Sequence, residues 1–169
     1  LIHAFEQSAS KRAMNSIKIF PGWTSKSYDG LKEGRRIRLD NKDLNTTNKN
    51  FPDHVIKAGA TVYQGGVNLS FGPEYVNLNL SGVYPNHTEV EVVKLFKGRF
   101  INEIDIKERR KVIVLHKKTA EILFDKTHTD PIGQFVNAGN VVYQVVGLYN
   151  DKGDSGDSDA YLPFTTLQT

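Results

Sequence analysis

Four consecutive apolar residues, Val112-Ile113-Val114-Leu115, constrain the fold of this chain more than any other feature of its sequence. A run this short and this rich in β-branched side chains is typical of a strand covered on both faces, rather than of a helix. Apolar residues then recur at helical spacing over 117–124, which predicts a helix there. A second apolar run, 141–149, predicts another strand. The centre of the chain therefore mixes strands with helices.

Upstream of this strand, the sequence predicts a helix over 87–97. Apolar residues recur on one helix face, and Gly98 suits the left-handed residue just past a helix end. A charged loop over 103–111 is then expected to lead into the buried strand. Two overlapping pairs at the helix start have the spacing of a capping box, and either can satisfy the free N–H groups: Thr88 with Glu91, and Asn86 with Glu89.

Residues 55–84 are predicted to form β structure. Apolar and polar residues alternate over 67–71 and again over 76–81, so one face of each strand is expected to be buried and the other to meet solvent or a partner. The segment Phe71-Gly72-Pro73-Glu74 is predicted to be the hairpin turn between them. A last strand is predicted over 160–164, and the mixture of elements indicates an α+β fold.

The first third of the chain gives weaker patterns. Its first helix has no capping residue, and the last residues of the chain carry no stop signal, so we expect a fragment of a longer protein. The predicted elements are a helix over 1–14, a strand over 17–20, a loop over 23–36, a strand over 36–40 and a polar helix over 41–50 that Pro52 ends.

The composition excludes several classes of protein. Of 169 residues, 38% are hydrophobic and 24% are charged, which fits a globular chain. The longest apolar run falls well short of the roughly 18 residues that a bilayer-spanning helix needs. The absence of cysteine excludes disulfides and thiolate sites, and a net charge of +3 is too small to call for nucleic acid.

The sequence contains none of the common catalytic or nucleotide-binding motifs, so we expect no catalytic, cofactor or metal site. Two groups of potential metal ligands occur, and we interpret both as solvated loops. A basic cluster around the buried strand is interpreted as solvated strand ends, because acidic residues are mixed into it. The first group, which could suit calcium, is Asp151, Asp154, Asp157 and Asp159, and the second is Asp125, His128 and Asp130. The basic cluster is Lys107, Arg109, Arg110, Lys111, Lys117 and Lys118.

Trp23 and Tyr28 stand in a polar segment, where aromatic side chains often anchor a partner. Packing of Trp23 beneath the loop is the alternative. These two residues are therefore predicted partner contacts, with the role of Trp23 left open.

Several segments, taken in order, resemble the periplasmic core domain of MacB-like (MacB/FtsX-type) ABC transporter permeases. They begin with Leu80-Ser-Gly-Val-Tyr-Pro85 and end with Ala160-Tyr-Leu-Pro-Phe-Thr165, and the buried strand lies between them. Two departures stand out: the loop 126–129 is longer than the family's usual link, and the family pattern continues past Thr169 with a further strand and helix. The residues that carry the resemblance are Gly98, Arg99, Phe100, Asp130, Pro131, Gly133, Gln134, Gly147 and Pro163.

The resemblance implies a mixed two-lobed domain outside the bacterial inner membrane. Residues 1–56 would begin a membrane-proximal lobe that is incomplete here, and 57–169 would form an inserted α/β lobe and the start of a return strand. It implies a non-catalytic domain without a cofactor, with ATP bound by an associated cytoplasmic ATPase. The other implied partners are a second permease chain, a periplasmic adaptor and an outer-membrane channel, and the isolated domain is expected to be monomeric.

The alternative hypothesis is a secreted ligand- or carbohydrate-binding module. It would use the Asn-rich sheet face and Trp23.

Overall fold

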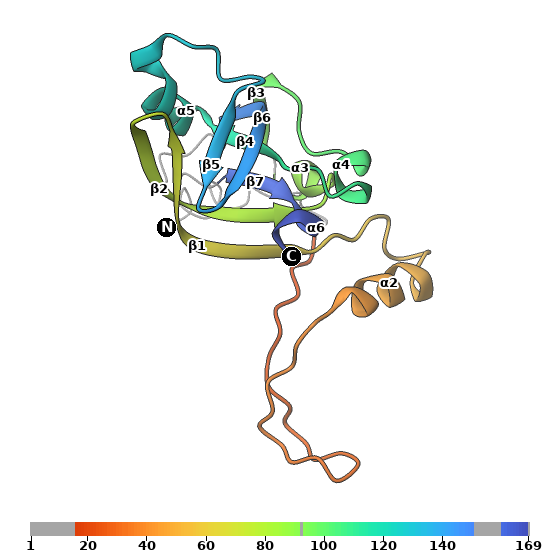
Figure 1. The fold of residues 1–169 in the computed structure, drawn as a ribbon. Coiled ribbons are helices and arrows are strands. Elements are labelled where there is room, and N and C mark those ends of the chain that lie inside the picture. Colours follow the sequence, from red (N-terminus) through yellow and green to blue (C-terminus); the bar gives the residue numbers. More distant parts are fainter. Residues whose placement is uncertain (1–15, 92, 151–159, 169) are drawn as a thin grey trace, which may run out of the picture. The chain divides into compact units, whose positions relative to one another are not determined.

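The computed structural model describes residues 16–91, 93–150 and 160–168, and its ribbon is shown in Figure 1. The chain divides into two units, one that ends at Ala58 and one that begins at Gly59, and each is described by itself. Within the described residues, none of the helices is both long enough and apolar enough to cross a bilayer. The predicted helix over 1–14 lies outside the described residues.

The helix predicted over 41–50 in unit 1 is confirmed as α2 (Asn41–Asn50). The side chain of Asp40 accepts hydrogen bonds from the backbone N–H groups of Lys42 and Asp43, at 2.7 and 3.1 Å. Asp43 in turn accepts from the backbone N–H of Asp40 at 2.7 Å, which completes a capping box. This local hydrogen bonding stabilises a helix whose residues are poor helix formers.

The strands predicted over 17–20 and 36–40 are wrong, because neither segment pairs with a sheet among the described residues. The segment between them is a narrow hairpin rather than a plain loop, with isolated bridges from Trp23 to Arg36 and from Tyr28 to Leu31. Asp29 and Gly30 have φ angles of 49° and 74° at its tip. Two positive φ angles in a two-residue connection are typical of a type I′ turn, for which Asp-Gly is a favoured pair.

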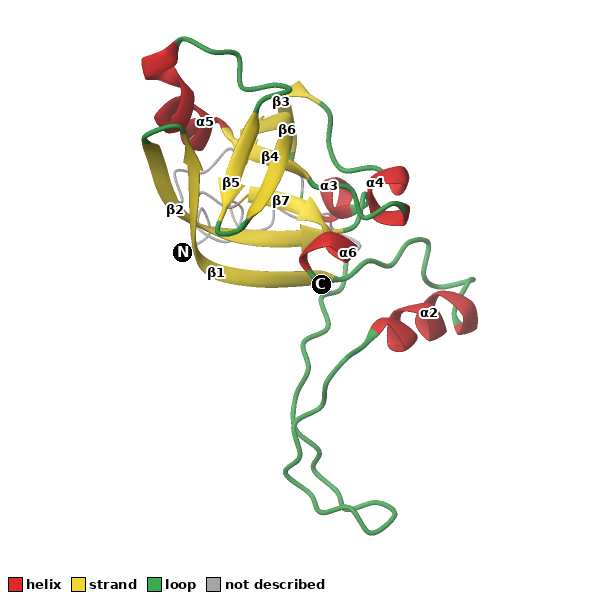
Figure 2. Cartoon of the chain, viewed as in Figure 1, coloured by secondary structure: helices red, strands yellow, loops and turns green. Residues whose placement is uncertain are grey.

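Unit 2 is built on one mixed sheet, ordered β3-β6-β4-β7-β2-β1-β5 (Figure 2). β5 also pairs with β6, so β6, β4, β7, β2, β1 and β5 close into a ring. β6 is long enough to pair with β5 through its first residues and with β3 through its last. The strands are β1 (Thr61–Phe71), β2 (Glu74–Val83), β3 (Lys94–Gly98), β4 (Val112–His116), β5 (Phe135–Ala138), β6 (Val141–Asn150) and β7 (Ala160–Pro163).

The prediction of a strand buried on both faces is confirmed by β4, every residue of which is buried. Ile113 and Leu115 point into the main core inside the ring, with Leu69, Leu80, Val136 and Leu162 among the residues around them. Val112 and Val114 point the other way, into a second core with Phe100, Ile101 and Tyr149. Alternation along one strand thus joins the two cores.

Short helices complete unit 2, and its mixture of helices with a sheet confirms the α+β prediction. The predicted helix over 117–124 is confirmed as α5, which buries Ala120, Leu123 and Phe124 in the main core. The strands predicted over 67–71, 76–81, 141–149 and 160–164 are also confirmed, except that Phe164 begins a helix. The helices are α3 (His87–Val90), α4 (Glu103–Lys107), α5 (Lys117–Phe124) and α6 (Phe164–Leu167), with a 3-10 turn over Asp125–Thr127.

The helix predicted over 87–97 is wrong beyond its first turn. α3 ends at Val90, and 94–98 form β3, which pairs antiparallel with the end of β6. Asn86 makes no side-chain hydrogen bond to the helix start, so the predicted capping box does not form there. Pairing with β6 is a long-range interaction, and it overrides the local helical periodicity.

The charged loop predicted over 103–111 is partly helical. α4 begins after Asn102, whose side chain accepts from the backbone N–H of Asp105 at 3.0 Å, while Asp105 accepts from the backbone N–H of Asn102 at the same distance. A capping box therefore occurs at the start of α4, and not at residue 86 or 88 as predicted.

Candidate functional site

Most of the residues that carry the family resemblance gather where β3 pairs with β6. Gly98 lies opposite Gly147 in the register of these strands, and the backbone N–H of Arg99 donates to the carbonyl oxygen of Val146 at 2.9 Å. A Cβ atom on Gly147 would strike the backbone carbonyl of Arg99. A Cβ atom on Gly98, where φ is +74°, would strike the carbonyl oxygen of Val146. Both positions therefore require glycine, because two backbones approach too closely for any side chain.

The turn 130–134 packs against the same pair of strands. Asp130 accepts from the backbone N–H of Ile132 at 3.1 Å and from the Lys97 ammonium group at 2.7 Å. Gly133 has a φ of +87°, and its N–H donates to the carbonyl oxygen of Val145 at 2.8 Å. The hydrogen bond from Lys97, with that from the backbone of Ile132, lowers the pKa of Asp130. Segments around residues 98, 133 and 147 thus meet at one junction.

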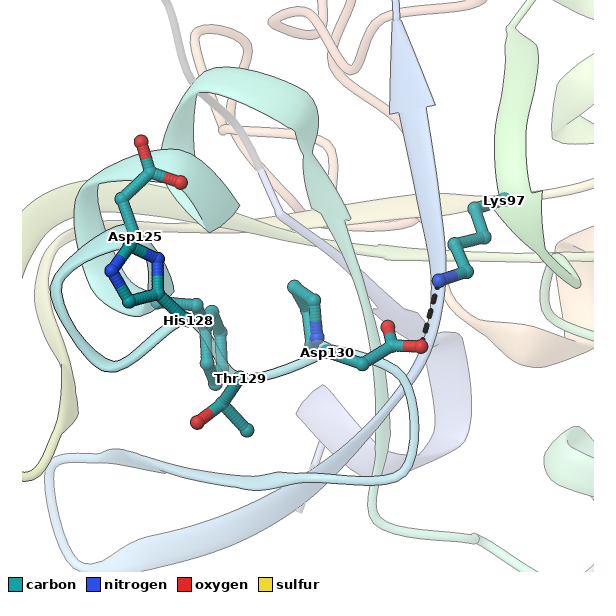
Figure 3. Close-up of a pocket in the computed structure, with 7 residues that line it drawn as sticks. Lys97, Asp125, His128, Thr129 and Asp130 are labelled. Atoms are coloured by element: carbon teal, nitrogen blue, oxygen red, sulfur yellow. Dashed lines mark hydrogen bonds and ion pairs between the residues drawn. The ribbon is translucent and has the colours of Figure 1, made fainter.

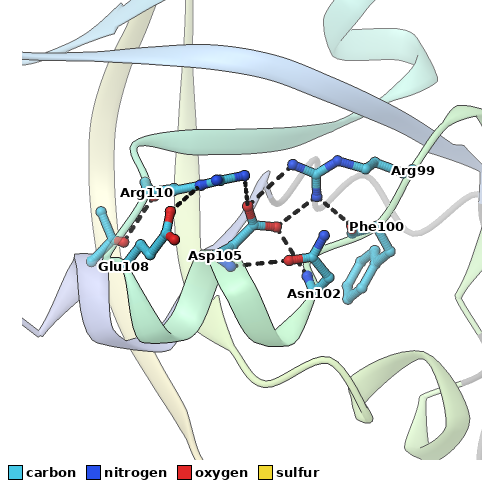
Figure 4. Close-up of polar contacts among 7 residues, drawn as sticks. Arg99, Phe100, Asn102, Asp105, Glu108 and Arg110 are labelled. Carbon is cyan, nitrogen blue, oxygen red and sulfur yellow. Dashed lines mark hydrogen bonds and ion pairs between the residues drawn. The ribbon is translucent and has the colours of Figure 1, made fainter.

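Arg99 holds a buried carboxylate next to this junction (Figure 4). Asp105 is fully buried, and both of its oxygens accept from the Arg99 guanidinium group, at 2.6 and 3.1 Å. Arg110 approaches the same carboxylate at 4.0 Å and pairs with the exposed Glu108 at 2.8 Å. This two-pronged geometry is the stronger form of an arginine–carboxylate pair, and it fixes α4 relative to the end of β3.

The other two resemblance residues serve the second core. Phe100 packs against Tyr161 with ring centroids 5.6 Å apart, and Tyr161 contacts Tyr149 at 4.8 Å. Pro163 ends β7 opposite Val83 and precedes α6. Hydroxyl groups of α6 then donate to carbonyl oxygens at α4 and just beyond it, from Thr165 to Ile106 at 2.7 Å and from Thr166 to Arg110 at 3.0 Å.

A shallow, open hollow of about 630 Å³ lies beside the junction (Figure 3). One of the two groups of potential metal ligands lines it: Asp125, His128 and Asp130. Figure 3 shows that Asp130 turns toward Lys97 and away from His128. Within the part of the chain that the structure describes, no cluster of three potential ligands forms a metal site. The acidic group of residues 151, 154, 157 and 159 lies outside the described residues.

The remaining candidates are exposed and scattered. In the basic cluster, Arg110 pairs with Asp105 and Glu108, and Lys117 pairs with Glu121 at 3.6 Å, so acidic side chains neutralise part of its charge. Trp23 and Tyr28 are 68% and 78% exposed on the hairpin of unit 1, and their role as partner contacts stays a prediction. What the described residues of unit 2 do form is a structural junction, where β3, β6 and the turn 130–134 meet.

Comparison with known proteins identifies relatives of this chain. The sequence-family model described as MacB-like periplasmic core domain matches residues 1–169 of this chain. The macrolide export ATP-binding/permease protein MacB of Rhodopseudomonas palustris is 26% identical over 163 residues, which cover 94% of this chain and 24% of that protein. MacB of Bartonella henselae is 28% identical over 104 residues, covering 60% of this chain and 16% of that protein. The chain thus spans a quarter or less of the length of these curated relatives.

Two solved structures share the fold. The extracellular domain of the noncanonical ABC-type transporter YknZ from Gram-positive bacteria superimposes with a TM-score of 0.66 at 25% identity, over 77% of this chain and 65% of that one. The periplasmic region of MacB from Actinobacillus actinomycetemcomitans gives a TM-score of 0.64 at 21% identity, over 86% of this chain and 64% of that one. Both are the parts of transporters that lie outside the membrane.

Proposed function

The chain belongs to the family of MacB-like periplasmic core domains, and we propose from this that it transmits motion between a cytoplasmic ATPase and the outer side of the membrane. It would do so as the extracytoplasmic domain of an ABC transporter permease, in export or in extraction of a substrate. The observation that carries the proposal is the family match along the full 169 residues, joined to the fold shared with two extracytoplasmic transporter domains.

The construction of unit 2 suits a mechanical element. Its sheet closes on itself through the pairing of β5 with β6, and β4 is buried on both faces. The glycine contacts of β3 with β6 and the buried pair of Arg99 with Asp105 brace the same region. A closely packed body of this kind moves as one piece, and rigid-body rotation about an interface is a common way to transmit a conformational change.

Unit 1 presents apolar side chains that its described residues do not cover. Ile17 and Ile19 are 88% and 73% exposed, and Ile37 and Leu39 are exposed as well. Such residues at alternating positions are suited to a sheet that other segments complete. We propose that further parts of the permease cover them in a membrane-proximal lobe, as the family resemblance implies.

The partners follow from the same proposal. ATP would bind to the associated ATPase, so this domain itself would need no cofactor and carry out no catalysis. A second permease chain, a periplasmic adaptor and an outer-membrane channel would be its other partners, and the isolated domain would be monomeric. The location would be the periplasmic side of a bacterial inner membrane.

The coupling is tested by a distance measurement in the full-length permease, reconstituted in nanodiscs with its ATPase. The chain contains no cysteine, so Glu121→Cys on the exposed side of α5 introduces a unique attachment point into this domain for a spin label. Pulsed electron paramagnetic resonance would compare the distance between labels on the two permease chains with and without trapped ATP. A change in that distance is expected, and the same distance with and without trapped ATP would contradict the proposal.

A control pair distinguishes movement of the whole unit from local rearrangement. Labels at Glu121→Cys and Asn79→Cys both lie within unit 2, on α5 and on the outer side of β2. The rigid construction predicts that the distance between them does not change with ATP.

A further inference from the structure

The outer side of the β2-β1-β5-β6 part of the ring is an uncharged surface rich in side-chain amides, which we call the carboxamide face. Ser70 of β1 lies between Tyr75 of β2 and Asn137 of β5, and Asn137 lies opposite Val142 of β6. Asn68 lies opposite Asn77 in the next row. The side chains of the face are Asn68, Ser70, Tyr75, Asn77, Asn79, Phe135, Asn137, Val142 and Gln144.

The pleat of the sheet places these side chains together. Their neighbours along each strand, Leu69, Leu78, Val136 and Tyr143, point inward to the main core. Residues at alternate positions must therefore point outward. The aromatic members stand well clear of the sheet, with Tyr75 71% exposed and Phe135 59% exposed. Figure 1 shows β1 beside β2 and β5 beside β6, and β1 also pairs with β5.

The face lacks the charges that a merely solvated surface normally carries. Charged residues make up 24% of the chain, yet within these four strands, all of them described, the single charged residue is Glu74. Its carboxylate accepts from the Lys126 ammonium group at 2.9 Å. Asparagine is also unfavourable in strands, so repeated amides at outward positions require an explanation other than strand stability.

The amides keep much of their hydrogen-bonding capacity, although Gln144 already donates one side-chain N–H to the carbonyl oxygen of Gly133 at 3.3 Å. Asn77 donates one side-chain N–H to the amide oxygen of Asn68 at 2.9 Å, which holds the two groups side by side. A side-chain amide offers two N–H donors and an oxygen that accepts twice, so each of these groups still has donors or acceptors for a ligand. Next to them, Gly66 leaves open space at a bulge of β1, where a Cβ atom would meet nothing within 4 Å.

The size of the face selects the kind of ligand. From Tyr75 to Asn79 it extends about 14 Å along a strand, and the width of four strands is about 14 Å. An area on the order of 200 Å² is well below the roughly 800 Å² per partner of a standard protein interface. Nucleic acid and anionic lipid headgroups require a cluster of cationic side chains, which this face does not supply from its described residues.

We propose that the carboxamide face binds an extended, uncharged oligosaccharide. Sugar hydroxyl groups both donate and accept hydrogen bonds, which matches the unused capacity of the amides of Asn68, Asn77 and Asn79. The flat C–H faces of sugar rings pack on exposed aromatic rings, here Tyr75 and Phe135. This binding function is separate from the mechanical coupling proposed above and does not depend on it.

The test is a titration of the isotope-labelled 169-residue chain with chitohexaose and cellohexaose, two uncharged β-1,4-linked hexasaccharides, followed by NMR. The expected result is saturable binding, with the largest chemical-shift changes at residues of the carboxamide face. Tyr75→Ala should weaken binding about fivefold or more through the loss of one aromatic contact. Asn77→Ala should weaken it as well, through the loss of hydrogen bonds.

The matched control is Phe96→Ala, because Phe96 is 57% exposed on β3 and lies outside the face. It should leave the affinity unchanged, and the amide spectra of all three variants would show that they remain folded. Three results would overturn the inference: no binding of either hexasaccharide at about 10 mM, binding that survives Tyr75→Ala and Asn77→Ala unchanged, or shift changes centred elsewhere on the chain.

Discussion

The buried carboxylate of Asp105 gives the sharpest prediction about what holds unit 2 together. In Asp105→Ala, the guanidinium group of Arg99 loses its two hydrogen bonds to the carboxylate, and α4 loses the acceptor for the N–H of Asn102. Removal of one partner from a fully buried ion pair costs about 3–5 kcal/mol. Here the side chains left behind are 40% and 46% exposed, so water can rehydrate Arg99 and Arg110. We therefore expect the lower end of that range, about 3 kcal/mol, to which the lost cap contributes.

Substitution of the arginine partner should lower the free energy of unfolding further. Arg99→Ala leaves Asp105 fully buried, and among the described residues Arg110 at 4.0 Å is then the one cationic side chain paired with it. We expect a loss of about 3–5 kcal/mol in the free energy of unfolding. The double variant should lose less than the sum of the two single losses, by about 1–3 kcal/mol, because the residues interact directly.

Urea and thermal unfolding, followed by circular dichroism, measure these differences. A loss of about 3 kcal/mol corresponds to a fall in Tm of roughly 6–12 °C for a chain of this length. Glu108→Ala is the control, since its pair with Arg110 is half exposed and should contribute less than about 1 kcal/mol. A loss below about 1 kcal/mol for Asp105→Ala, or strict additivity in the double variant, would refute the reasoning.

Four other predictions follow from the junction, the core and the proposed assembly. Gly147→Ala should destabilise unit 2 by about 3 kcal/mol or more, because the new Cβ meets the Arg99 carbonyl. Gly133→Ala has open space around its Cβ and should cost only about 1 kcal/mol, and chemical unfolding compares the two variants. Leu123→Ala should cost about 2–5 kcal/mol in the same assay, because that side chain is fully buried. The pKa of Asp130 is lowered in the folded chain, so the stability it adds is present above its unfolded pKa and is lost as the pH falls through the folded value; NMR titration should show that Lys97→Ala moves this pKa back up. Sedimentation of the isolated chain at micromolar concentration should give a monomer, and a tight dimer would count against contacts made mainly by the rest of the permease.

Local patterns were enough to predict the centre of unit 2. The apolar run of β4 and the helical spacing of α5 reflect burial that each element imposes on its own residues. The alternation in β1 and β2 likewise reflects one buried and one exposed face. These elements match because the same side chains determine both the local conformation and the core.

The error over 94–97 arose because a partner distant in sequence decides the conformation there. Residues 94–97 have helical periodicity, yet they form β3 because the end of β6, some fifty residues later, pairs with them. The close approach of Gly98 to Gly147 depends on the same pairing, so the sequence alone does not reveal why both positions require glycine. In the 125–130 loop, interpreted as solvated, Asp130 pairs with Lys97 at 2.7 Å, a contact that the local sequence does not reveal.

Two missed elements did have local signals. Asn102 followed by Asp105 has the spacing of a capping pair, and it begins α4 within a segment interpreted as a charged loop. Asp29-Gly30 is a favoured pair for a two-residue hairpin turn, and it forms the tip of the hairpin in unit 1. Charge and loop-like composition concealed both signals.

The location of the domain is the claim on which the proposed function rests, and cysteine labelling tests it most directly. Full-length permease carrying Glu121→Cys would be exposed, in cells with a permeabilised outer membrane, to a maleimide that does not cross the inner membrane. Residue 121 is about half exposed, whereas Val145 is fully buried, so Val145→Cys serves as the unreactive control. The account predicts rapid labelling of residue 121 in these cells while the inner membrane is intact. Labelling of this residue only after the inner membrane is broken would contradict it.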